Sequence, residues 1–307
     1  MKVFRTLAEL AATNRPVSLA IGVFDGVHLG HQRVLNQARA ARAADGLAVA
    51  LTFDPHPIRI LRPDHAPVLL TSTAHKLALI EQLDIDACVL IHFDNAFAAI
   101  TAEQFIAQLA FCRHICVGTR FHFGHDRTGN PALLAQLAPR YGFTVTEIKP
   151  VLTPAGEMIS STAVRQHILA GNLDRAAAML GRPFSILGTV IKGDGIGHQL
   201  GYPTANVYPA PGGEAFPPDG VYLTRVTVAG QTLTGVINLG RRPTFTDRSH
   251  QRLLEVHLLD FNRDIYGQEL EVTFLQKLRG EQKFATVGDL KIQIAADIAT
   301  ARQLTPA

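Results

Sequence analysis

Short apolar runs alternate with helical patterns over the first half of the chain. The apolar runs have the length of strands that are buried on both faces, and the segments between them repeat their apolar residues with helical spacing. We therefore expect strands at residues 18–24, 48–53, 88–93, 114–118 and 143–148, and helices at 31–46, 75–83, 102–110 and 131–142. Strict alternation of strand and helix is typical of a parallel sheet that helices cover on both faces.

Two more helices are predicted at the end of this half. Ser160 or Ser161 would cap the first helix, which ends at Gly171. Asn172 would cap the second helix, which ends at Gly181. The pattern changes directly after these helices.

The second half of the chain has the pattern of antiparallel strands separated by glycine and proline turns. At least five strands are expected, at residues 184–192, 220–230, 231–240, 253–261 and 269–278. The second and third of them form a hairpin with its turn at Ala229–Gly230. Strands of this kind predict a small barrel. The chain ends in an amphipathic helix with Val287, Leu290, Ile294 and Ile298 on one face.

The change of pattern at Arg182–Pro183 indicates two domains. The predicted fold class is α/β plus β. Residues 1–182 would form a Rossmann-like domain with a parallel sheet, and residues 183–307 a small antiparallel β-barrel with a terminal helix.

The composition of the 307-residue chain narrows the class of protein. Hydrophobic residues make up 47% of it and charged residues 18%, which excludes a disordered chain. No apolar run reaches the roughly 18–20 residues that a membrane helix needs, and Glu9 interrupts the apolar part of the N-terminus, where a secretory signal would be uncharged. The formal charge of +3 is compatible with phosphate-bearing substrates and too small to indicate nucleic-acid binding.

Three cysteines, Cys88, Cys112 and Cys116, cannot form a disulfide framework, and a small odd number is typical of a reducing cytosol. Cys112 and Cys116 bracket His114, as the ligands of a metal can. Their segment has the pattern of a buried strand, however, so we expect a structural role. The composition thus predicts a soluble cytoplasmic protein without a membrane or nucleic-acid partner.

The most informative stretch is GVFDGVHLGHQ, residues 22–32, which follows a predicted buried strand. His28 and His31 lie in the turn before the next helix, at the carboxyl edge of the sheet, where parallel α/β folds bind ligands. The glycines leave room for a phosphate near the backbone, and the helix start attracts an anion. Two imidazoles can donate hydrogen bonds to a phosphoryl group, and Asp25 can orient one of them or bind a metal. The alternative is a pair of histidines that only cap a helix.

This stretch resembles the His-x-Gly-His signature of the nucleotidyltransferase superfamily, whose members transfer a nucleotide monophosphate and release pyrophosphate. TFDPHP (52–57) and ISSTAVR (159–165) narrow the resemblance to the adenylyltransferase half of bacterial bifunctional riboflavin kinase/FAD synthetase. The resemblance implies that His28 and His31 are catalytic, and that ATP is bound by Gly22, Phe24, Asp25, Gly30, Ser161, Thr162 and Arg165. Hydroxyls at a helix start, with an arginine one turn later, form an anion site. Alone, SSTAVR also fits an ordinary capped helix.

The segment VGTRFHFGHDRTGN (117–130) matches the glycines and phenylalanines of the same family. With the TFDPHP motif, it implies that FMN is bound by His56, Phe121, Phe123 and Asn130. Arg120 departs from the family, which usually has Asp or Asn there, and His122 replaces a common Arg or Thr. A guanidinium in place of a carboxylate or amide reverses the charge or the hydrogen-bond sense beside the nucleotide. Phe121 and Phe123 also fit ordinary core packing.

The other informative stretch is KGDGIGHQLGYPTAN, residues 192–206. Its glycines are Gly193, Gly195, Gly197 and Gly201, and their spacing is neither that of a P-loop nor G-x-G-x-x-G. They fit a mobile loop over phosphates or a long flexible turn. LGYPTANV resembles the riboflavin kinase signature, which implies that Thr204 and Asn206 meet a Mg²⁺–ATP complex. Two oxygen-bearing side chains suit a hard cation that keeps several waters.

The resemblance to riboflavin kinases continues through NLGRRPTF (238–245), LEVHLLDFNRDIYG (254–267) and EVTFLQKLRGEQKF (271–284), with His198 in place of a common arginine. It assigns Glu255 as the base that faces the ribityl hydroxyl of the flavin. A carboxylate within hydrogen-bond reach can accept the proton as the hydroxyl attacks the γ-phosphate. The alternating pattern of its strand also explains Glu255 as an ordinary exposed residue.

The resemblance covers almost the whole chain and implies a bifunctional enzyme. The barrel would phosphorylate riboflavin to FMN with ATP and Mg²⁺. The α/β domain would then transfer AMP from a second ATP to FMN, giving FAD and pyrophosphate. Arg120 and His122 motivate the alternative of a riboflavin kinase whose adenylyltransferase domain is weakened or repurposed.

Overall fold

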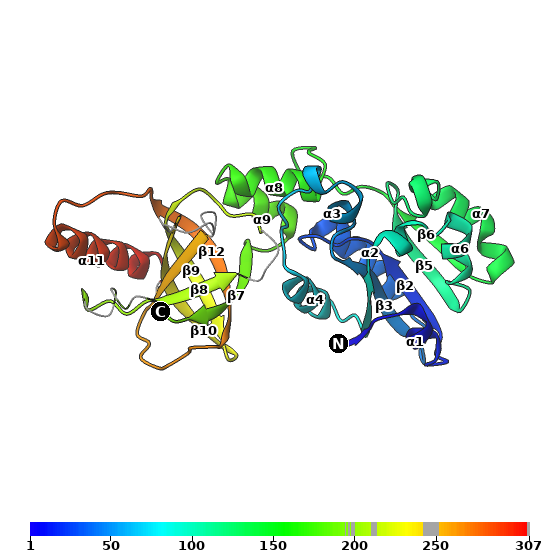
Figure 1. Ribbon diagram of the computed structural model, residues 1–307, viewed down its shortest axis with the longest axis horizontal. Coiled ribbons are helices and arrows are strands. Elements are labelled where there is room, and N and C mark those ends of the chain that lie inside the picture. Colours follow the sequence, from blue (N-terminus) through cyan, green and yellow to red (C-terminus); the bar gives the residue numbers. More distant parts are fainter. Residues whose placement is uncertain (194, 196, 198–199, 210–213, 242–251, 306–307) are drawn as a thin grey trace. The chain divides into compact units, whose positions relative to one another are not determined.

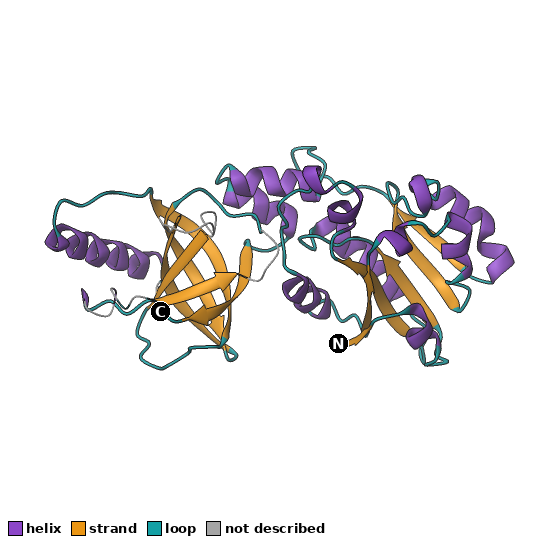
Figure 2. Ribbon diagram, in the orientation of Figure 1, coloured by secondary structure: helices purple, strands orange, loops and turns teal. Residues whose placement is uncertain are grey.

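The computed structural model describes residues 1–193, 195, 197, 200–209, 214–241 and 252–305. The chain divides into two units, Met1–Ala163 and Val164–Ala307. Figure 1 shows the elements of both units in chain order, and Figure 2 distinguishes their helices from their strands. The division falls inside a helix, α8 (Ser161–Leu169), whereas the junction expected from the sequence follows the next helix, α9 (Leu173–Leu180).

The first unit is built on a six-stranded sheet in the order β1-β4-β3-β2-β5-β6, and every neighbouring pair of strands is parallel. The strands are β1 (Lys2–Phe4), β2 (Val17–Ile21), β3 (Leu47–Asp54), β4 (Ala87–His92), β5 (Cys112–Gly118) and β6 (Thr144–Ile148). The helices are α1 (Leu7–Ala11), α2 (Leu29–Ala40), α3 (Pro57–Leu61), α4 (Thr73–Glu81), α5 (Asn95–Ala98), α6 (Ala102–Ala107) and α7 (Pro131–Tyr141), with short 3₁₀ turns at Pro63–His65 and His125–Arg127. The predicted parallel α/β domain is confirmed.

The two faces of the sheet carry side chains of different size. In β3, Val49 and Leu51 face a cluster that includes residues of α1, α6 and α7, whereas Ala48 and Ala50 face residues of α2 and α4. Cys88 and Cys116 lie on the face with the small residues, and both are fully buried. Cys112 is also buried, on the opposite face, so Cys112 and Cys116 both pack in the core as the sequence predicts.

The second unit contains a closed barrel in the order β10-β11-β8-β7-β12-β9, in which all pairs are antiparallel. Its strands are β7 (Ser185–Ile191), β8 (Ala205–Pro209), β9 (Gly220–Val228), β10 (Gln231–Arg241), β11 (Arg252–Leu258) and β12 (Glu269–Arg279), and the helix α11 (Val287–Leu304) follows them. The predicted barrel and terminal helix are confirmed. Buried side chains such as Leu254, Val256 and Phe274 fill the barrel.

The helix α11 lies against the outer wall of the barrel. Ile298 and Ala301 of the helix pack on Val221, Leu223 and other outward-facing strand residues. A capping box between Thr286 and Asp289 starts the helix. This arrangement explains the amphipathic pattern of the helix, except that Val287 of the predicted apolar face is 61% exposed.

Several elements differ from the sequence prediction. The elements β1, α1, α3 and α5 were not expected, because each has five residues or fewer and shows no clear periodicity. The strand β8 was expected as a turn, because it follows Pro203 and ends at Pro209. The strand β2 ends at Ile21 rather than at Phe24, and α2 ends at Ala40, before the expected stop at Gly46.

Candidate active sites

The chain turns sharply between β2 and α2, in residues 22–28. Phe24, Gly26 and Val27 have φ angles of 54°, 82° and 42°, in the left-handed region that glycine favours. The backbone of Phe24 and of the β-branched Val27 is therefore strained. Both side chains are buried in the core beside α2, which holds them in place. Strain that the surrounding packing enforces is common at functional sites.

His28 is the N-cap of α2, and its Nδ1 accepts a hydrogen bond from the backbone N–H of His31 at 3.3 Å. In the neutral ring the proton is therefore on Nε2, which is a donor. The rings of His28 and His31 stack with their centroids 3.6 Å apart. Gly30 permits this geometry, because a Cβ on it would lie 3.0 Å from Cε1 of His28. Helix capping thus accounts for His28 but not for the stacked pair.

His31 is held in its neutral form. Burial lowers the pKa of His31 well below its ordinary value, and the positive charges of His28 and Lys76 lower it further. The edge of the Phe24 ring packs on His31, with the ring centroids 5.4 Å apart. The buried Nδ1 of His31 has no hydrogen-bond partner among the described residues. His31 therefore has hydrogen-bonding capacity that the described part of the protein does not use.

Asp25 binds backbone groups of a distant segment. Its carboxylate is 4% exposed, and Oδ1 accepts hydrogen bonds from the N–H groups of Leu70 at 2.8 Å and Thr71 at 3.2 Å. The N–H of Gly26 in turn donates to Oγ1 of Thr71 at 3.2 Å. Asp25 therefore anchors the turn to the segment before α4, and its predicted roles in orienting a histidine or binding a metal or ATP stay predictions.

Ser161 connects the start of α8 with the turn between β2 and α2. Its Oγ donates a hydrogen bond of 2.9 Å to the backbone carbonyl of Asp25. Ser160 rather than Ser161 caps the helix, because Oγ of Ser160 accepts from the N–H of Ala163 at 3.2 Å. Thr162 is exposed in the first turn of α8, and Arg165 follows one turn later in the same helix. The helix start thus lies directly beside the turn that carries His28 and His31.

The predicted FMN-binding residues all have structural contacts. Phe123 is 9% exposed and packs against Phe105, and Phe121 stacks on Phe123 with ring centroids 5.3 Å apart. Asn130 and His56 cap α7 and α3. Arg120 and His122, the two departures from the family, are both exposed, so neither places a buried charge in the unit. The roles of His56, Phe121, Phe123 and Asn130 in FMN binding stay predictions.

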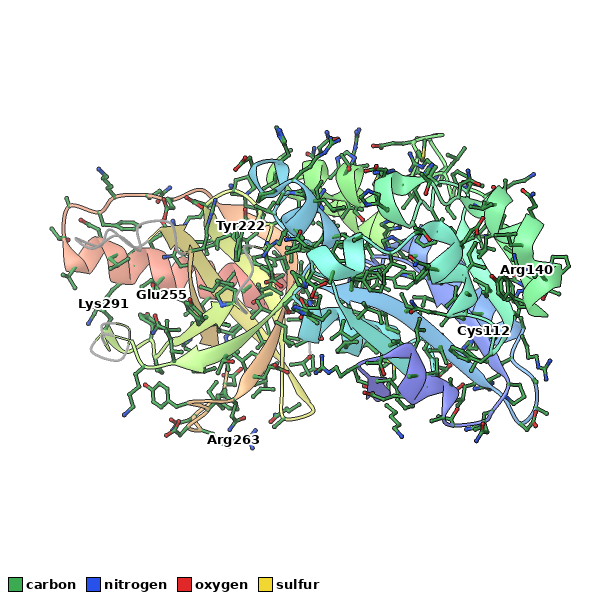
Figure 3. The ribbon with its side chains drawn as sticks, turned by 45° about the vertical axis from the view of Figure 1, so that its right-hand side comes forward. Cys112, Arg140, Tyr222, Glu255, Arg263 and Lys291 are labelled. Carbon is green, nitrogen blue, oxygen red and sulfur yellow. The ribbon has the colours of Figure 1, made fainter. Side chains whose placement is uncertain are left out.

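The second unit has a cavity of about 590 Å³ on the outer wall of the barrel, beneath α11. Residues of three predicted motifs line it: Gly195 and Gly197, Thr204 and Asn206, and Glu255. Figure 3 labels Glu255 in the barrel and Lys291 on α11. The other lining side chains that matter below are Asn238, Arg279, Phe284, Leu290, Ile294 and Asp297. The cavity therefore brings together the residues predicted for the kinase site, except Gly193 and Gly201.

Strand register places Glu255 between two amides. Glu255 of β11 pairs with Asn206 of β8 on one side and with Asn238 of β10 on the other. Directly opposite residues of antiparallel strands point to the same face, with their Cβ atoms roughly 4.5–5.5 Å apart. The neighbours Leu254 and Val256 are buried inside the barrel, so the row faces outward. Glu255 is on the outer face, as its alternating pattern suggested, and this face is where the cavity lies.

Two glycines of the predicted phosphate loop approach the motif that follows them. A Cβ on Gly193 would lie 2.0 Å from Nδ2 of Asn206, and one on Gly197 would lie 2.8 Å from Oγ1 of Thr204. Gly193 therefore lies close to Asn206, although it does not line the cavity. Gly201 has a φ of 88°, in the left-handed region that glycine favours, and the part of both glycines in binding ATP stays a prediction.

A buried ion pair fixes α11 to the barrel at the cavity. Nε of Arg279 lies 3.0 Å from Oδ1 of Asp297, and the terminal Nη2 lies 2.9 Å from Oδ2. Gln293 donates to the same carboxylate at 2.9 Å, and Asp297 is 6% exposed. The guanidinium also faces the ring of Phe284. Arg279 and Asp297 lie in different elements, and only the fold brings them together. Neither they nor Asn238 could therefore be predicted from a local motif.

A second, smaller cavity of about 140 Å³ adjoins the first. Thr204 lines both cavities. The remaining walls are mainly apolar and include Val190, Phe261 and Tyr266.

Among the described residues, no group of three or more His, Cys, Asp or Glu side chains could hold a metal ion. The described part of the chain also has no helix that is long and apolar enough to span a membrane.

The parallel sheet with a glycine turn at a helix start, and the barrel with a carboxylate at a cavity, are typical of an enzyme that transfers phosphate-containing groups. A sequence model of the FAD synthetase family matches residues 10–163, and one of the riboflavin kinase family matches residues 180–305. The chain therefore belongs to the bifunctional riboflavin kinase/FMN adenylyltransferase family.

Relatives in this family match almost the whole chain. The bifunctional riboflavin kinase/FMN adenylyltransferase of Escherichia coli K12 is 39% identical, over 99% of this chain and 97% of its own length. That of Haemophilus influenzae is 37% identical, over 98% of both chains. The crystal structure of a protein described as a macrolide-efflux protein from Streptococcus pneumoniae is 30% identical, with a TM-score of 0.80 over 98% of both chains. The predicted family is confirmed, and no observation favours a kinase with a repurposed first domain.

Proposed function

We propose that the second unit transfers the γ-phosphoryl group of ATP to riboflavin, and that the first unit transfers AMP from a second ATP to the FMN so formed. The observation that carries this proposal is the cavity that gathers Gly195, Thr204, Asn206 and Glu255 from separate motifs. Such convergence of a glycine loop, polar side chains and a carboxylate in one cavity is the arrangement that phosphoryl transfer requires.

In the kinase site, Glu255 accepts the proton of the ribityl hydroxyl while the hydroxyl oxygen attacks the γ-phosphorus and ADP leaves. Asn206 and Asn238 flank the carboxylate and limit its orientation. The apolar residues of α11, with Phe284, provide a surface for the flavin ring. The chain has no tryptophan, so phenylalanine or tyrosine supplies any aromatic stacking. The smaller cavity beside Thr204 suits the adenine ring of ATP.

The residues of this cavity fit a Mg²⁺ ion bound with ATP. Thr204 and Asn206 present hydroxyl and amide oxygens, which are hard ligands, and both line the cavity beside Glu255. Two protein ligands leave most of the coordination to phosphates and water, which is how Mg²⁺ is usually bound. When bound, the ion would neutralise charge on the transferring phosphates.

In the first unit, His28 and His31 stabilise the charge that develops on the α-phosphoryl group of ATP, and a phosphate oxygen of FMN displaces pyrophosphate. The glycine turn and the start of α8, with Ser161 and Thr162, bind the other phosphates of ATP. FMN is bound through the segments that carry His56, Phe121, Phe123 and Asn130. No covalent enzyme intermediate is needed.

We place the boundary between the two activities at Arg182–Pro183, because the riboflavin kinase match begins at residue 180, next to this junction. The substrates are small molecules, and neither nucleic acid nor a membrane takes part. The chain works in the cytoplasm, which suits its three free, buried cysteines.

The products of purified protein with riboflavin, ATP and Mg²⁺ test the proposal. Mass spectrometry should detect FMN first, and then FAD with pyrophosphate. His31→Ala should abolish FAD formation and leave FMN formation intact. Glu255→Gln should lower the kcat of FMN formation by about 10²–10⁴-fold, because it removes the base but keeps the side-chain size. Glu269→Gln, at an exposed position of the same barrel, is the matched control.

Two results would contradict the proposal. Wild-type protein that forms FMN but no FAD would refute the adenylyl-transfer site. Loss of both activities in a folded His31→Ala or Glu255→Gln variant would refute the assignment of the two sites to separate units.

A further inference from the structure

Lys76 is a lysine of α4 that lies buried in the first unit. Its side chain is 6% exposed, and Nζ lies 3.1 Å from the carbonyl oxygen of Phe53 and 3.4 Å from that of Val23. Lysine is rarely buried so completely, because an ammonium group loses its hydration. Neither the sequence motifs nor the reaction steps above use this residue.

The two carbonyl groups belong to the two motifs that border the predicted adenylyl-transfer site. Val23 lies in the turn that carries His28, and Phe53 lies at the end of β3, in the TFDPHP segment. The carbonyl of Val23 accepts a second hydrogen bond from Oγ1 of Thr52, at 2.8 Å. Lys76 therefore connects the carboxyl ends of β2 and β3 from the side of α4.

The residues around Lys76 strengthen the same connection. One turn earlier in α4, Oγ1 of Thr73 donates to Oδ1 of Asp54 at 2.9 Å. The segment before α4 supplies the N–H groups that bind Asp25. The start of α4 and its preceding segment thus support both motifs through backbone and side-chain hydrogen bonds, and Lys76 is the only lysine or arginine between Thr71 and Leu79.

We propose that Lys76 is a positioning residue for adenylyl transfer, which fixes the backbone that presents His28 and His31. This inference rests on the proposed role of the two histidines. Lys76 acts through the backbone of the turn, so its contribution is to geometry. A displacement of reacting groups by about 1 Å can cost about 10²-fold in rate, which sets the scale of the effect.

The charge of Lys76 also acts on the histidine pair. The charged and titratable groups that face Lys76 are Asp25, Asp54 and Cys88, and those that face His31 are His28 and Lys76. Burial lowers the pKa of Lys76, and the two carboxylates oppose that shift. Because the ammonium lowers the pKa of His31, its removal should raise that pKa. This shift reports on the charge of Lys76, whereas a fall in kcat without a change in KM reports on positioning.

Lys76→Met tests the inference, because methionine keeps much of the length and removes the charge and the donors. Because the carboxylates of Asp25 and Asp54 remain when the ammonium is removed, the variant should be less stable than the wild type, and thermal unfolding must show that it folds. We expect the kcat of FAD formation from FMN and ATP to fall about 10–100-fold, with little change in either KM. NMR titration of ¹³C-labelled histidines should show the pKa of His31 raised relative to the wild type.

Three controls accompany this variant in the full-length protein. Lys2→Met makes the same change at an exposed position of β1 and should leave FAD formation unchanged. FMN formation from riboflavin reports on the second unit, and thermal unfolding followed by circular dichroism reports on the fold. If Lys76→Met does not fold, Lys76→Gln takes its place under the same criteria.

A kcat within about threefold of the wild type, or an unchanged titration of His31, would overturn the inference. Unfolding of both variants would also overturn it, because Lys76 would then serve the fold alone. The variant His31→Ala distinguishes a failure of the positioning role of Lys76 from a failure of the proposed role of the histidines. If His31→Ala forms FAD at the wild-type rate, the role of the histidines is wrong and the inference falls with it.

Discussion

Gly193→Ala tests how the glycine loop serves the kinase site. A Cβ on Gly193 would lie 2.0 Å from Nδ2 and 2.6 Å from Cγ of Asn206, whereas ordinary contacts begin near 3.4 Å. The amide must therefore move by more than 1 Å. It is the end of a flexible side chain and can rotate to another rotamer at a cost of about 1 kcal/mol or less. The barrel should remain stable while Asn206 loses its place beside Glu255.

The expected effect follows from that displacement. Misplacing a substrate-positioning group by about 1 Å costs up to about 10²-fold in rate, or about 2.7 kcal/mol. We therefore expect kcat/KM for ATP in FMN formation to fall about 10–100-fold, with FAD formation from supplied FMN unchanged. Gly288→Ala is the matched control, because the nearest atom to a Cβ there is at 3.4 Å.

A double-mutant cycle decides whether Asn206 transmits the effect. If it does, Gly193→Ala adds nothing to Asn206→Ala, and the double variant has the activity of Asn206→Ala alone. Additive losses, or a wild-type rate for Gly193→Ala, would refute the reasoning. Steady-state assays of ADP release, with thermal unfolding as the check on stability, are sufficient to distinguish these results.

Other predictions concern the first unit. Ser161→Ala removes the hydrogen bond to the carbonyl of Asp25. It should lower the kcat/KM of FAD formation about tenfold, or about 1.4 kcal/mol, without affecting FMN formation. A rate of FAD formation equal to that of the wild type would contradict this prediction. Because the pKa of His31 is lowered by folding, the unfolded chain binds a proton that the folded chain does not, so stability falls as the pH drops below 6.5. Thermal midpoints should decrease from neutral to mildly acidic pH, and less steeply in His31→Gln; identical slopes would contradict this origin. Burial raises the pKa of Cys88 and Cys116 to about 12, so a thiol reagent should label them only after unfolding, and rapid labelling of the native protein would contradict their burial.

The sequence predicts the fold well where a pattern is long and local. Continuous apolar runs identified the inner strands of the parallel sheet, and a change from helical to alternating pattern identified the barrel. β8 was missed because prolines at 203 and 209 make its sequence resemble a turn, although pairing with β7 and β11 makes it a strand. Local pattern does not show such tertiary pairing.

The sites were predicted in part. The motifs singled out His28, His31, Asn206 and Glu255 because each lies in a distinctive local stretch, and the roles of these residues stay predictions. The sequence did not show that Asp25 binds a segment about 45 residues away, or that Asn238 stands beside Glu255. Both facts depend on register and packing between distant segments, which a single sequence does not specify.

The row formed by Asn206, Glu255 and Asn238 has a consequence for refolding experiments. A slip of β11 by one residue would turn Glu255 into the barrel and expose Leu254 or Val256 at the wall of the cavity. A barrel with shifted strands would be compact and rich in β-structure, yet would lack the proposed base at the cavity. The rate of FMN formation therefore measures the amount of barrel with the correct strand pairing, whereas circular dichroism measures all β-structure. A recovered activity below the recovered circular dichroism signal would give the fraction of molecules trapped in a wrong register.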